Sequence, residues 1–91
     1  MKDLPRNVKA YKRTDVFDEK NIPTGLLKDH LVADDVWAKI VVLKGNLTYV
    51  IQGEHPEEVK LGLLKHGVVE PGVYHHVIAH EGVEFYVEFY K

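Results

Sequence analysis

The chain has 91 residues, and its 12 Lys and Arg against 14 Asp and Glu give a formal net charge of −2. This length accommodates one core, so we expect a single domain over residues 1–91. No basic field is present to attract phosphates or anionic lipids, which excludes nucleic acid and membrane surfaces as expected partners. Because no membrane-length apolar run or secretory leader is visible, we expect a cytoplasmic protein.

Cysteine and serine are both absent, which excludes disulfides, thiol chemistry and a serine nucleophile. Val, Lys and Glu are abundant whereas Asn and Gln are scarce, a balance that favours a thermophilic source. A small domain without disulfides depends on packing, a metal or an oligomer for stability. Since small β domains often pair to hide their edge strands, we expect a homodimer.

The N-terminal third of the chain contains two β-type runs. Residues 8–13 and 26–32 are predicted strands. Between them, residues 14–19 are predicted to form one helical turn, because Thr14 or Asp15 can cap it.

The remainder of the chain alternates β-branched runs with turn residues. Residues 36–43 and 47–51 flank the Lys44-Gly45-Asn46 turn and predict a β-hairpin. Further strands are predicted at 59–64 and 68–70, with His66-Gly67 and Pro71-Gly72 as turns. Residues 74–79 and 83–90 form the last predicted pair, separated by His80-Glu81-Gly82.

These signals together predict an all-β fold. Strands recur every 8–12 residues without a long amphipathic helix, as is typical of an antiparallel barrel or sandwich. We expect at most one or two short helical turns. The last run alternates, with Val83, Phe85, Val87 and Phe89 on one face and Glu84, Tyr86, Glu88 and Tyr90 on the other.

Six histidines are the main source of possible chemistry. His55, His66 and His80 lie in predicted turns, where solvated side chains are the usual outcome. The neighbours His75 and His76 point to opposite faces of a strand. His75 shares its face with small apolar residues, so we expect it inside, either as a metal ligand or as a hydrogen-bonded core histidine.

Two motifs are similar to those of cupins. The stretch Gly67-x3-Pro71-Gly72-x2-His75 resembles the second cupin motif, and Val41-Val42-Leu43-Lys44-Gly45-Asn46-Leu47 resembles the end of the first. A closer resemblance, carried by residues 9–13, 17–19, 22–30, 36–49, 71–75 and 85–90, is to the small cupin-like family related to tellurite-resistance protein B (the TehB/YeaR-like group). It implies a compact jelly roll, with His30, His75 and Glu88 as recurrent polar positions.

Three hypotheses of function follow from these residues. The first is a divalent metal (Zn, Ni, Fe or Mn) bound by His30, His75 and Glu88, with an open position for water, an oxyanion or a small substrate. Glu88 alone could equally be solvent-facing.

The second hypothesis is a metal-free small-molecule or anion-binding module, with Trp37, Tyr49, Tyr86 and Tyr90 as aromatic walls. It is favoured because the usual first-motif ligand positions hold no histidine or glutamate. The third is a dimerising structural role. The family label points to tellurite or oxyanion resistance but defines no reaction, so catalytic residues and enzyme activity stay open. Methyl transfer is not expected, because no glycine-rich nucleotide motif is present.

Overall fold

Two antiparallel β-sheets form the protein, and the structure, a computed structural model, describes all 91 residues. The elements in chain order are β1 (Ala10–Arg13), β2 (Phe17–Asp18), the 3-10 turn η1 (Thr24–Leu27), β3 (Trp37–Lys44), β4 (Leu47–Ile51), β5 (Glu57–Leu61), β6 (Gly67–Val69), β7 (His75–Ala79) and β8 (Glu84–Tyr90). The predicted all-β class with at most two helical turns is confirmed. The single helical turn lacks the length and apolar character needed to cross a bilayer.

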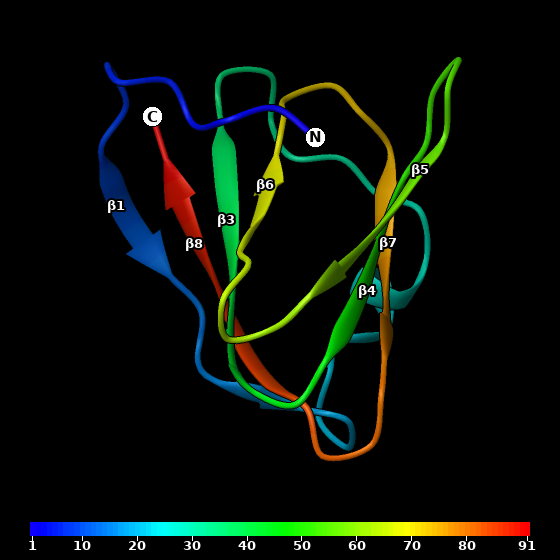
Figure 1. The fold of residues 1–91 in the computed structure, drawn as a ribbon. Coiled ribbons are helices and arrows are strands. Elements are labelled where there is room, and N and C mark those ends of the chain that lie inside the picture. The colour runs from blue at the N-terminus through cyan, green and yellow to red at the C-terminus, as the bar shows by residue number, and fades with distance from the viewer.

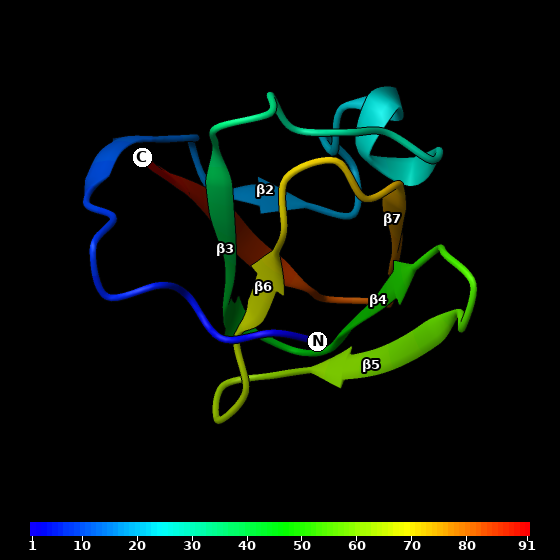
Figure 2. The same cartoon turned by 90° about the horizontal axis from the view of Figure 1, so that it is seen from above.

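The two sheets face each other as a sandwich (Figures 1 and 2). The first sheet has the order β1-β8-β3-β6, with β2 also paired to β8, and the second has the order β5-β4-β7. Alternation along β8 places Phe85 and Val87 in the core, as predicted. The largest fully buried side chains come from both sheets and from the turn before β8: Tyr49, Phe85, Leu47, Leu61, Val42, Val69 and Val83.

The predicted hairpin of residues 36–51 and the predicted pair of residues 74–79 and 83–90 are both wrong, because the two strands of each are divided between the sheets. β3 pairs with β6 and β8, whereas β4 pairs with β5 and β7. Gly45, with φ of 73°, turns the chain from one sheet into the other, and Gly82, with φ of 78°, does so between β7 and β8. A Cβ on Gly45 would lie 3.1 Å from the Cα of Val83, so the two crossings pack closely. A short glycine turn is compatible with a hairpin or with such a crossing, and only the pairing partners distinguish them.

The N-terminal predictions need two corrections. Residues 14–19 contain the short strand β2 instead of a helical turn, because Phe17 pairs with Phe85 and their rings pack edge to face at 5.7 Å. Residues 26–32 are not a strand: they begin in η1 and continue as an extended stretch in which His30 alone forms a bridge. Leu26 and Val32 of this stretch are partly buried and pack against the core. Their burial outweighs the local preference for a strand.

Candidate functional site

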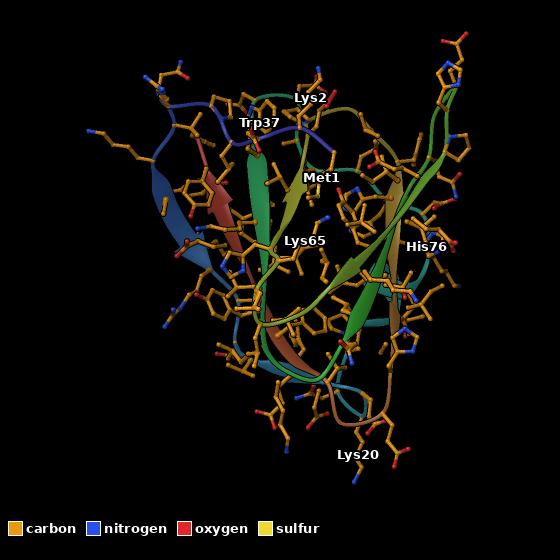
Figure 3. All side chains as sticks on the ribbon, in the orientation of Figure 1. Met1, Lys2, Lys20, Trp37, Lys65 and His76 are labelled. Carbon is orange, nitrogen blue, oxygen red and sulfur yellow. The ribbon has the colours of Figure 1, made fainter.

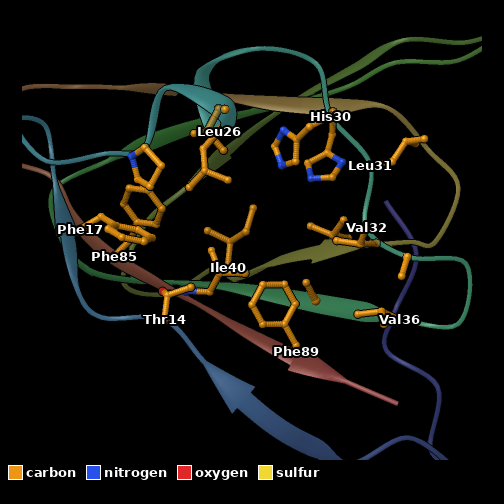
Figure 4. A pocket seen from close by; sticks show the side chains of 18 of the residues that line it. Thr14, Phe17, Leu26, His30, Leu31, Val32, Val36, Ile40, Phe85 and Phe89 are labelled. Carbon is orange, nitrogen blue, oxygen red and sulfur yellow. The ribbon is translucent and has the colours of Figure 1, made fainter.

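A pocket of about 470 Å³ lies between the sheets, and hydrophobic side chains make up 14 of its 19 lining residues. β3 contributes Ala38 and Ile40, and β8 contributes Phe85, Val87 and Phe89. Figure 4 shows Leu26 and His30 on one side of the pocket, with Ile40 and Phe89 on the other. The inward-facing residues of β8 therefore pack in the core and also form one wall of this pocket.

Residues 23–36 form the opposite wall, and we call them the covering segment. Eight of the lining residues belong to it: Pro23, Gly25, Leu26, His30, Leu31, Val32, Ala33 and Val36. It is attached to β7 by a backbone bridge in which the His30 amide donates to the His75 carbonyl at 2.9 Å and the His75 amide donates to the His30 carbonyl at 3.0 Å. This bridge places the two side chains next to each other.

The rings of His30 and His75 lie 4.1 Å apart between centroids, inclined at 55°, and both line the pocket. Each ring uses Nδ1 in the same way: the His30 Nδ1 bonds the Lys28 carbonyl at 2.9 Å, and the His75 Nδ1 bonds the Val73 carbonyl at 3.0 Å. A carbonyl only accepts, so Nδ1 carries the hydrogen in both rings. In the neutral imidazole, Nε2 then holds a lone pair that is available to a ligand.

His75 is the one polar residue in the buried set, with 3% of its surface exposed. Burial lowers the pKa of His75 from its ordinary 6.5, with the neighbouring His30 as a further cause, while the bond to Val73 acts in the opposite direction. The ring of Tyr49 stands edge-on to His75 at 5.9 Å, and its hydroxyl donates to the Val68 carbonyl at 3.0 Å. Burial also raises the pKa of Tyr49, so both side chains are held neutral.

His76 points to the opposite side of β7, as predicted, and Figure 3 shows it away from the space between the sheets. Its Nδ1 lies 2.7 Å from the Asp29 carboxylate, which also accepts a 3.4 Å bond from Gln52. The hydrogen bond from His76 lowers the pKa of Asp29. The covering segment is therefore attached to β7 from outside by Asp29 and from inside by His30.

Glu88 does not join the two histidines. It lies on the outer face of β8, where its carboxylate accepts a 2.5 Å bond from the Tyr90 hydroxyl. Burial, followed by this bond, raises the pKa of Tyr90. The chain contains no group of three His, Cys, Asp or Glu side chains arranged to hold a metal ion. The structure thus brings together two of the three predicted ligands, because strand alternation places Glu88 on the face opposite to Val87 and Phe89.

The other sequence predictions for this region have mixed outcomes. His55, His66 and His80 are exposed, as predicted, and His80 bonds the Thr48 hydroxyl at 2.8 Å. None of the four aromatic residues expected as walls, Trp37, Tyr49, Tyr86 and Tyr90, lines this pocket, whose aromatic lining is Tyr11, Phe17, Phe85 and Phe89. The inward alternation of β8 already indicated Phe85 and Phe89, whereas no sequence signal identified the covering segment.

These features define a small β-sandwich domain with an apolar pocket that carries two imidazoles at one wall. The TehB-like domain model matches residues 12–87, and the chain belongs to this family, as its resemblance implied. No curated protein matches the chain.

Two solved structures are similar to the chain. A crystal structure of a protein from Escherichia coli (strain K12) has a TM-score of 0.88 at 19% identity, and the match covers 100% of this chain and 97% of that one. This likeness establishes the shared fold. TehB from Haemophilus influenzae has a TM-score of 0.82 at 28% identity over 91% of this chain, but the match spans 31% of TehB.

Proposed function

We propose that this protein binds a small, mostly apolar molecule between its sheets and holds the molecule's polar group on His30 and His75. The observation that carries this proposal is the convergence of two imidazoles on an otherwise hydrophobic pocket. Ligand sites typically combine such an enclosure with a few placed polar groups, in volumes of about 300–1,000 Å³. The pocket volume of about 470 Å³ lies in this range.

A pocket-filling variant tests the proposal. Leu26 of the covering segment is half-buried, and Figure 4 shows its side chain at the pocket, so Leu26→Trp adds bulk there. The wild type should bind the neutral dye N-phenyl-1-naphthylamine saturably, with a rise in fluorescence, and Leu26→Trp should weaken binding by about tenfold or more. The matched control is Lys28→Trp, an exposed position in the same segment. Equal binding by both variants, or no saturable binding by the wild type, would contradict the proposal.

A divalent cation is a second candidate ligand, favoured by the way each Nδ1 is bonded to a carbonyl. Metal-binding imidazoles commonly have this arrangement, with Nε2 left to coordinate. The chain supplies two ligands here and not the three of the sequence hypothesis, so other positions would fall to water or a bound molecule. Elemental analysis after loading with Zn, Ni, Fe or Mn should find about one ion per chain in wild type and none in His75→Ala.

An oxyanion is the ligand class connected with tellurite resistance. The pocket favours it less than an apolar molecule or a divalent cation. Neither Lys nor Arg lines it, so no fixed positive charge is available to compensate a buried anion. A role in oxyanion resistance would therefore act through a bound metal or an apolar compound. Titration with tellurite in the presence and absence of zinc distinguishes these cases, because direct capture requires no metal.

A further inference from the structure

The polar groups that line the pocket are mainly hydrogen-bond acceptors. The Nδ1 hydrogens of both histidines are used by the Lys28 and Val73 carbonyls, which leaves two Nε2 lone pairs on neighbouring rings. The hydroxyl of Thr14, which also lines the pocket, donates to the Asp15 carbonyl and accepts from the Val87 amide. The remaining polar side chain of the lining, Tyr11, is half exposed, and no lining residue carries a permanent charge.

Two neighbouring acceptors of this kind distinguish ligands by whether the ligand can donate a hydrogen bond. A hydroxyl group donates its hydrogen to an Nε2 lone pair and gains a hydrogen bond of ordinary strength. A carboxylate presents lone pairs to lone pairs and must also lose its hydration without a cation nearby, which is strongly unfavourable. An ether of the same shape loses the hydrogen bond but incurs no charge penalty.

We infer that the pocket selects a neutral ligand with a hydroxyl donor on a compact apolar body, such as a phenol or a hydrophobic alcohol, and rejects carboxylates and other oxyanions. This inference rests on the proposed function, because it specifies the ligand of the same pocket. The burial of His75 in an uncharged, mostly hydrophobic pocket supports it, since such surroundings disfavour a charged ligand.

The walls indicate the shape of the apolar body. Phe17, Phe85 and Phe89 supply flat surfaces, and Phe17 and Phe85 already pack edge to face. A dry cavity of about 150 Å³ accepts benzene, and the pocket here measures about 470 Å³. A ligand with a single ring or with two fused rings therefore fits better than an extended chain.

Three matched probes test the inference: 2-naphthol as the donor, 2-methoxynaphthalene as its donor-free analogue and 2-naphthoate as the anion. Near pH 7.5, where a phenol is neutral, calorimetry should give 2-naphthol an affinity about tenfold above that of 2-methoxynaphthalene. Binding of 2-naphthoate should be weaker than that of either. Comparable or tighter binding of 2-methoxynaphthalene or 2-naphthoate overturns the inference while leaving the proposed function intact. No binding of any probe overturns both.

Variants localise the preference to the two rings. His30→Phe and His75→Phe keep a ring but remove the lone pair, so the ratio of the 2-naphthol to 2-methoxynaphthalene affinities should fall toward one. Retained affinity for 2-methoxynaphthalene shows that each variant has kept its pocket. The half-buried His30 is the safer substitution if His75→Phe does not fold. His55→Phe, an exposed control, should keep the wild-type ratio. A ratio that is unchanged in His30→Phe overturns the inference.

Discussion

The two faces of β8 carry opposite chemistry within seven residues. Phe85, Val87 and Phe89 face inward and line the pocket, whereas the alternate residues face outward among charged neighbours. On the outer face, Arg13 lies 4.8 Å from the ring of Tyr86, and Lys39 lies 5.6 Å from the ring of Tyr90. A polar residue between apolar ones on a strand therefore lies in a different environment from its sequence neighbours.

Truncation of one aromatic side chain on each face should produce the largest difference. Phe85 is fully buried, so Phe85→Ala should lower the free energy of unfolding by about 3–5 kcal/mol. Tyr86→Ala removes a half-exposed ring and its contact with Arg13, at a cost of about 1 kcal/mol or less. Urea denaturation of the two variants measures the difference, and similar losses would contradict the assignment of the faces.

An intermediate effect should come from pH, through the inward-facing His75. Its folded-state pKa lies below the ordinary 6.5, so protonation favours the unfolded chain. The contribution of His75 to stability is therefore complete above pH 6.5 and is lost as the pH falls through the folded-state pKa. Asp29 adds nothing in this range, because its pKa is lowered from an ordinary 3.8.

Denaturation at a series of pH values between about 8 and 5 measures this contribution of His75. The wild type should lose stability toward the acid end, and His75→Gln, which cannot titrate, should have a shallower dependence. His66→Gln, a substitution at an exposed position, is the control and should have the same pH dependence of stability as the wild type. A wild-type slope in His75→Gln would assign the effect to another group.

The smallest effect is expected for Glu88. Glu88→Gln preserves an acceptor for the Tyr90 hydroxyl on the outer face, so stability should change by less than about 1 kcal/mol. Dye and metal binding should equal those of the wild type within error. Loss of metal binding in Glu88→Gln, measured by elemental analysis, would restore the three-ligand hypothesis.

Local alternation predicted the interior correctly wherever it was applied to a true strand. His75 was assigned inward from its apolar neighbours, and the buried face of β8 was assigned from its Val and Phe residues. The same alternation already placed Glu88 outside, whereas the family resemblance included it among the ligands. Alternation gives no direction for His30, because His30 is held by a single bridge to His75 and does not belong to a strand of its own.

The sequence by itself determined the class of the fold, the inner and outer faces of its strands and the membership of a family, because these depend on short-range periodicity and on motif order. Tertiary structure decided which strands pair, how Gly45 and Gly82 cross between sheets and how residues 23–36 cover the pocket. It also brought together His30 and His75, which are 45 positions apart in the sequence. Such pairings depend on burial and on hydrogen bonds between distant segments, and a local sequence pattern contains neither.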